Sequence, residues 1–160
     1  MTVEVIQADY NNPRQATHII ELLDCYATDP MGGGVALNDY VAQNLIPSLS
    51  QRADAFSILA YIDHQPAGLV NCFEGFSTFA CRPLINIHDV VVAEEYRRMG
   101  ISSAMLDMVE KIARQRDCCK LTLEVIEGNS VARKAYEQYG FSPYKLNDSN
   151  GHAMFWEKNF

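Results

Sequence analysis

The sequence lacks any apolar run near the roughly 20 residues that a membrane-spanning helix needs. Its first residues also lack the basic-then-apolar pattern of a secretory signal peptide. Basic residues are few, because 13 Lys and Arg stand against 20 Asp and Glu, for a net charge of −7. That balance argues against a surface for nucleic acid or anionic membrane. We therefore expect a cytoplasmic protein that binds neither.

Residues with metal-ligand or disulfide spacing are absent as well. The five cysteines, an odd number, contain no C-x-x-C pair, and they are Cys25, Cys72, Cys81, Cys118 and Cys119. In a cytoplasmic chain this pattern favours reduced thiols. The four histidines are scattered without helical or hairpin ligand spacing. We predict no metal site.

The chain has 160 residues, of which 48% are hydrophobic, so it can bury one core without disulfide or metal support. It contains no internal repeat, low-complexity segment or interdomain linker. We therefore predict a single domain over residues 1–160.

Hydrophobic periodicity predicts the order of helices and strands. In the first half we expect a strand at 2–8, a helix from Asn12-Pro13 to about Ala27, a second helix capped by Asn38, and strands at 55–62 and 67–73. In the second half we expect a strand at 85–92, a helix at 101–116, a strand at 120–126, a helix from Asn129 or Ser130 to Gly140, and a strand at 152–158. Strands and helices are mixed, which excludes a helical bundle and a doubly wound sheet.

The segment Ile85–Leu106 carries the most information about function. An apolar strand ends there in a short polar turn that leads directly into a helical pattern. The first N–H groups of a helix have no intrahelical partner, and the helix dipole adds positive potential, so such a turn suits phosphate. Gly100 and Ser102 are small enough for close approach, and the guanidinium groups of Arg97 and Arg98 can add charge-assisted contacts.

Two motifs in this order resemble the GNAT acyltransferase superfamily. Arg97–Ser102 is similar to its acyl-CoA loop, Gln/Arg-x-x-Gly-x-Gly/Ala, with Ser102 where glycine or alanine is usual. Leu121–Phe141 resembles its C-terminal signature at Leu123, Val125, Asn129, Ala132, Tyr136, Gly140 and Phe141. The resemblance runs from about Ala55 to the end of the chain. It implies an α/β (α+β) GNAT fold, with a mixed sheet of six to seven strands flanked by about four helices.

The resemblance also implies acetyl-CoA as co-substrate, held between two strands that splay apart, here 85–92 and 120–126. The pantetheine arm is then expected on the backbone of Val90 and Val92, like an added strand. Asn129 is expected near the pantetheine as well, although it can equally cap a helix. The diphosphate is expected on the loop formed by Arg97, Arg98, Met99, Gly100, Ile101, Ser102 and Ser103.

The reaction implied is direct attack of an amine on the thioester, which needs an acid near sulfur and a route for the amine's proton. Tyr136 occupies the family position of the acid. Glu124 and His88 are the leading candidates for the base, with Asp89, Glu74 and solvent water also open. Strand alternation places Asp89 on the face opposite His88.

The acceptor is the least determined part of the prediction. Tyr26, Asp29 and Glu74 are candidates to bind it, and a run of three glycines follows at 32–34. Acidic and aromatic side chains suit a small ammonium through charge and cation–π contact. We favour an N-acetyltransferase for the primary amine of a small molecule. An acetyltransferase for protein N-termini or lysines, and an acyl-CoA-binding sensor without turnover, stay open, as does a homodimer through the C-terminal aromatic residues.

Overall fold

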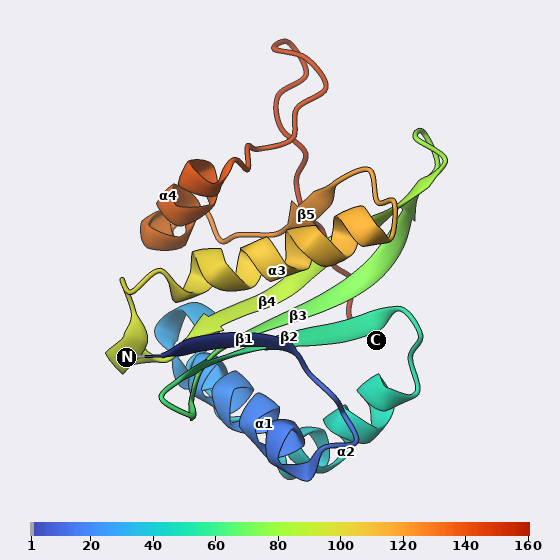
Figure 1. The fold of residues 1–160 in the computed structure, drawn as a ribbon. Coiled ribbons are helices and arrows are strands. Elements are labelled where there is room, and N and C mark those ends of the chain that lie inside the picture. The colour runs from blue at the N-terminus through green and yellow to red at the C-terminus, as the bar shows by residue number, and fades with distance from the viewer. Residues whose placement is uncertain (1) are drawn as a thin grey trace. The chain divides into compact units, whose positions relative to one another are not determined.

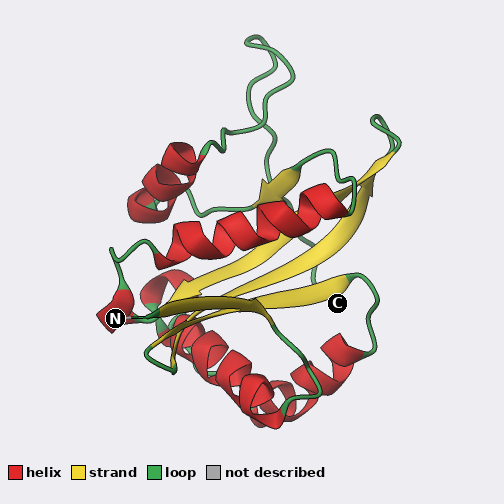
Figure 2. Ribbon diagram, in the orientation of Figure 1, coloured by secondary structure: helices red, strands yellow, loops and turns green. Residues whose placement is uncertain are grey.

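The computed structural model describes residues 2–160, which form two compact units that divide after Leu123. The single domain stays a prediction. The first unit is a five-stranded sheet in the order β1-β2-β3-β4-β5. Helices α1 and α2 cover one face of this sheet and α3 covers the other (Figure 1). Strands occupy only this middle layer between the helices (Figure 2).

The strands and helices follow the predicted order as far as α4. They are β1 Val3–Gln7, α1 Pro13–Thr28, the 3-10 turn η1 Pro30–Gly32, α2 Asp39–Ser50, β2 Ala55–Ile62, β3 Gln65–Ser77, β4 Arg82–Val92, the 3-10 turn η2 Glu94–Tyr96, α3 Ile101–Gln115 and β5 Leu121–Leu123, with α4 Ser130–Tyr139 in the second unit. Strands β1 to β4 are antiparallel, and β5 pairs parallel to β4 after the α3 crossover. No helix within residues 2–160 has both the length and the apolarity that crossing a membrane requires.

Local sequence explains where these elements begin and turn. Asn12 caps α1, because its side-chain oxygen accepts the N–H groups of Arg14 and Gln15. Asp63 and His64 both have positive φ, at 46° and 68°, as a two-residue hairpin turn between twisted strands requires. The predicted caps and the β2–β3 hairpin are therefore confirmed.

The core lies on both faces of the sheet. Against α3 it is apolar, and the helix buries Ile101, Met105, Leu106, Val109, Ile112 and Ala113. Gly68 lets α3 lie close to β3, since a Cβ there would lie 2.7 Å from Met105 Cε. Under the opposite face, α1 packs Ile19 and Leu22 against Leu59, Tyr61, Leu69, Val91 and Ala93.

The predicted strand count is wrong in detail. The sheet has five strands rather than six or seven, and residues 152–158 contain no strand among the described residues. Only one isolated bridge, Lys145 to His152, forms there, while Phe155 and Trp156 are exposed. A strand needs a continuous ladder with a neighbour, which alternation in the sequence does not supply. The homodimer through this segment stays a prediction.

Candidate active site

The loop between β4 and α3 has the backbone geometry of an anion site. Arg98 and Gly100 both adopt the left-handed conformation, with φ of 64° and 80°. Gly100 is the N-cap of α3 and offers no side-chain cap, so the helix start is not blocked by its own chain. Successive N–H groups in such a turn form a concave site for phosphate oxygens. The side chain of Ile101 is buried in the core, and therefore only its backbone can meet a ligand.

Strand β4 continues beyond its pairing with β5. The parallel ladder consists of Ile85 with Leu121, Asn86 with Thr122, and Ile87 with Leu123. From residue 88 to Val92 that edge of β4 extends past the end of β5. Val90 and Val92 lie in this stretch, directly before the loop. The edge therefore offers backbone donors and acceptors to an extended amide-bearing ligand.

A β-bulge reshapes β4 beside this edge. Asn71 pairs with Asp89, whereas the next residue, Cys72, pairs with Ile87, so His88 is the extra residue. The His88 ring contacts Phe73 edge-on, with 5.5 Å between centroids. Asn71 and Phe73 share one face of β3, and consequently His88 and Asp89 lie on the same face of the sheet. The prediction that they lie on opposite faces is wrong, because simple alternation does not anticipate a bulge.

A chain of polar side chains crosses three strands and ends at Asp89. Tyr10 Oη lies 2.8 Å from Ser57 Oγ, Ser57 Oγ donates to Asn71 Oδ1 at 2.7 Å, and Asn71 Nδ2 donates to Asp89 Oδ2 at 3.0 Å. Ser57 and Asn71 are buried, at 0% and 5% exposure. The sequence analysis did not identify these residues. The signal was available, since Ser57 and Asn71 are polar residues inside otherwise apolar strands.

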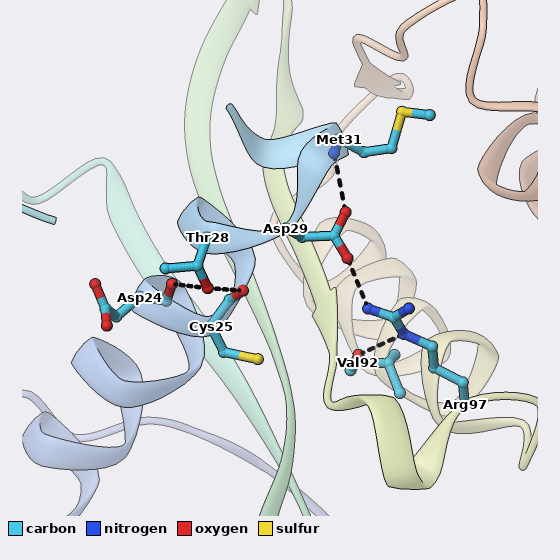
Figure 3. Close-up of polar contacts among 7 residues, drawn as sticks. All are labelled: Asp24, Cys25, Thr28, Asp29, Met31, Val92 and Arg97. Atoms are coloured by element: carbon cyan, nitrogen blue, oxygen red, sulfur yellow. Dashed lines mark hydrogen bonds and ion pairs between the residues drawn. The ribbon is translucent and has the colours of Figure 1, made fainter. Parts of the chain in front are cut away.

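Asp29 and Arg97, predicted for acceptor and cofactor respectively, form an ion pair with each other (Figure 3). Arg97 Nη2 lies 3.0 Å from Asp29 Oδ2, and Arg97 Nε donates to the carbonyl of Val92 at 3.3 Å. The other oxygen of Asp29 accepts the N–H of Met31. The pKa of the Asp29 carboxyl is held below its usual value, mainly by this hydrogen bond from the backbone and secondly by the contact with Arg97. The pair connects the segment before the glycines at 32–34 to the end of β4, because Asp29 contacts Arg97 and Arg97 in turn contacts Val92.

Tyr26 lies next to these carboxylates at the end of α1. Partial burial raises the pKa of its phenol, and the carboxylates of Asp89 and Asp29 raise it further. The corner that follows depends on Gly32, because a Cβ there would lie 1.9 Å from the carbonyl oxygen of Tyr26. Tyr26, Asp29 and Asp89 are therefore neighbours in the first unit.

Glu74 belongs to a different environment. Its carboxylate pairs with Arg116, which follows α3, at 3.0 Å. The Arg116 guanidinium also lies 4.7 Å from the centre of the Phe56 ring. Glu74 thus faces the α3 side of the sheet, whereas Asn71 and Asp89 face the α1 side. The structure does not bring Glu74 together with Tyr26 and Asp29.

Glu124, Asn129 and Tyr136 lie in the second unit. Asn129 caps α4, since its side chain accepts the N–H of Ala132 at 3.1 Å. Tyr136 is half-buried and meets the Phe141 ring edge-on, with centroids 6.0 Å apart. The helix ends at Gly140 with φ of 115°, as its sequence predicts.

The thiols provide no reactive centre in the core. Burial raises the pKa of the Cys72 thiol to about 12, so it is a neutral packing group at physiological pH. Within residues 2–160, no group of three His, Cys, Asp or Glu side chains is arranged to hold a metal ion.

Comparison with known proteins identifies the family. Residues 16–141 match the acetyltransferase (GNAT) family. The chain is 24% identical over 114 residues to thialysine N-epsilon-acetyltransferase of Caenorhabditis elegans, covering 71% of this chain and 69% of that protein.

Two solved structures share the fold. One is AAC(6')-Iy in complex with the bisubstrate analog CoA-S-monomethyl-acetylneamine, with a TM-score of 0.78, 14% identity and full coverage of both chains. The other is a ribosomal-protein-alanine N-acetyltransferase from Brucella melitensis biovar Abortus 2308, with a TM-score of 0.68, 22% identity, and coverage of 91% of this chain and 99% of that one. With the family match over most of its length, the chain belongs to the acetyltransferase (GNAT) family and is an N-acetyltransferase.

Proposed function

We propose that this protein transfers the acetyl group of acetyl-CoA to the primary amine of a small molecule, by direct attack in a ternary complex. The observation that carries the proposal is the end of β4. Three features lie together there. The edge of β4 extends past β5, the loop that follows has a backbone that suits phosphate, and the carboxylate of Asp89 lies beside that edge. A diphosphate joined to an amide-bearing arm and a reactive thioester has the chemistry to use all three features.

Acetyl-CoA then binds through the backbone. The pantetheine amides pair with Val90 and Val92, and the diphosphate takes the N–H groups of residues 98–103. Because Arg97 is already paired with Asp29, Arg98 is the guanidinium that we assign to the phosphates. Asn129 contacts the pantetheine while it caps α4. A bisubstrate analog containing CoA on a relative of the same fold supports this donor.

The chemistry needs the acceptor nitrogen to lose two protons, one before its attack and one after it, and the departing thiolate to gain one. The acceptor enters as an ammonium, since alkyl amines have a pKa near that of lysine, about 10. It loses a proton, attacks the thioester carbonyl, and the C–S bond breaks. We assign Tyr136 as the acid that protonates the departing thiolate. Glu124 and His88 are the leading candidates for the base, and Asp89, Glu74 and solvent water stay open.

A small acceptor agrees with the charge of the protein and with its relatives. The net charge is −7, and two carboxylates lie near Tyr26. The names of the relatives refer to thialysine and an acetylneamine derivative, both of them small molecules. A protein acceptor is the alternative, since a ribosomal-protein-alanine N-acetyltransferase shares the fold.

Thiol release from acetyl-CoA tests the proposal. Purified protein is assayed with small primary amines and with N-terminal and lysine peptides, alongside Tyr136→Phe. We expect turnover with one small-amine class and a loss of about 100-fold or more in Tyr136→Phe. Turnover with peptides alone would replace the small acceptor by a protein. Tight acetyl-CoA binding without turnover on any acceptor would favour a sensor.

A further inference from the structure

The polar chain from Tyr10 to Asp89 is costly for a sheet to bury. Ser57 and Asn71 lie between buried apolar neighbours such as Ile58 and Val70. Within the described residues, every buried side-chain polar atom has a hydrogen-bond partner. Hydrogen bonds of this kind add little net stability over apolar side chains of the same shape. A role in stability alone therefore does not explain why these four polar side chains are linked by hydrogen bonds.

The hydrogen bonds of the chain have one direction. Asn71 donates to the Asp89 carboxylate, so its amide oxygen faces back toward Ser57 and accepts the Ser57 hydroxyl. Ser57 Oγ is then left to accept from the Tyr10 phenol. Every donor points toward Asp89. These hydrogen bonds thus fix Oδ2 of one carboxylate beside the bulge in β4.

We infer that Asp89 takes the proton of the acceptor ammonium, and that Asn71, Ser57 and Tyr10 are positioning residues that hold its carboxylate for this step. The inference rests on the proposed function and names the base that the proposal leaves open. With Oδ2 held by Asn71, Oδ1 meets the acceptor. Partial burial at this position makes its charge count for more than that of a carboxylate in open solvent.

The ammonium gives one proton to Asp89, and the nitrogen lone pair forms a C–N bond at the thioester carbonyl carbon. The C–S bond breaks, and its electron pair leaves on sulfur. The nitrogen loses a second proton, the thiolate gains one, and Asp89 returns its own to solvent. The products are the N-acetyl amine, free thiol and one proton.

A double-mutant cycle between Asn71 and Asp89 tests the inference. Asp89→Asn keeps an acceptor oxygen for Asn71 but removes the charge, and we expect kcat to fall about 100- to 1000-fold while the KM for acetyl-CoA is unchanged. Asn71→Leu should lower kcat about 10- to 100-fold through misplacement of the carboxylate. In the Asp89→Asn background, Asn71→Leu should cost nothing further, because both act on one group.

Two conservative variants keep the test valid if Asn71→Leu folds poorly. Tyr10→Phe removes only the last donor of the chain, and we expect a loss of about threefold in kcat. Its matched control is Tyr61→Phe, which removes a buried phenol bonded instead to His18 Nδ1, and should leave kcat unchanged. Thermal melts on the same samples show that each variant is folded.

The outcomes separate the inference from the proposed function. If the wild type turns over and Asp89→Asn keeps its full kcat, the inference alone is overturned. The inference alone is also overturned if Asn71→Leu still lowers kcat when Asp89 is already replaced by Asn. Absence of wild-type turnover on every amine overturns the proposed function, and the inference with it.

Discussion

The two faces of the central sheet differ in what they bury. The face under α3 is apolar where the helix packs, and the buried Val70 and Cys72 lie on the same face of β3 as Gly68, which meets Met105. The face under α1 has an apolar cluster around Leu69, but beside it runs the polar chain that ends at Asp89. Adjacent residues of one strand therefore serve different purposes.

In the first unit we therefore expect stability to depend mainly on one face of the sheet and activity on the other. An apolar face can be close-packed, and each side chain in it adds stability in proportion to the area it buries. A face that carries a buried hydrogen-bonded chain ending in a carboxylate gains less stability and instead fixes the direction of one charged group. The α3 face should therefore respond to substitution in stability, and the α1 face in activity.

The largest stability effect is expected on the α3 face, at Met105. Its side chain is fully buried, so Met105→Ala should lower the free energy of unfolding by about 2–5 kcal/mol. Met105→Leu conserves volume and should cost less than about 1.5 kcal/mol. Urea unfolding measures both. If Met105→Ala lowered kcat strongly in fully folded samples, the division between the faces would fail.

The next effect is expected at Gly32, on the α1 side. Gly32→Ala places a Cβ within 1.9 Å of the Tyr26 carbonyl oxygen, and therefore the corner must move. We expect a loss of about 1–3 kcal/mol in stability and a raised KM for the amine, because Tyr26 and Asp29 move with it. Gly128→Ala, where a Cβ meets nothing within 4 Å, is the control. An unchanged KM for the amine would remove Tyr26 from the acceptor site.

The smallest effect is expected from the Asp29–Arg97 pair. Arg97 is half exposed, so Asp29→Asn or Arg97→Gln should cost about 0.2–1 kcal/mol, and less at high salt. Because the folded-state pKa of Asp29 is lowered, its contribution is present in full above the unfolded pKa of about 4 and is lost as the pH falls from there through the lower folded-state pKa. Urea unfolding at pH 7 and pH 3 tests this. An Asp29→Asn penalty as large at pH 3 as at pH 7 would contradict the assignment.

The sequence predicted the α3 face and the turn that leads into α3, because both depend on local patterns. Ile101, Met105 and Ile112 repeat at helical spacing, and Gly100 directly precedes this helical pattern. The predicted loop contains the two left-handed residues, although only Gly100 indicated this in advance.

The α1 face was not predictable in the same way, because its key features are not local. The bulge at His88 reverses the expected alternation and depends on pairing with β3. Asp29 meets Arg97 across 68 residues, and Ser57 meets Asn71 across 14. Neither separation along the sequence produces a periodic pattern of residues from which the contact could be predicted. Glu74 was assigned to the acceptor because it follows a strand, but its partner Arg116 comes from the other face.

The most direct test of this account compares two adjacent residues of β3. Val70→Ala, on the α3 face, should lower the free energy of unfolding by about 2 kcal/mol and leave kcat unchanged in folded samples. Asn71→Leu, on the α1 face, should lower kcat at least about tenfold in folded samples. Steady-state kinetics and urea unfolding on the same preparations measure both. Full kcat in Asn71→Leu, or an equal loss of kcat in Val70→Ala, would contradict the account.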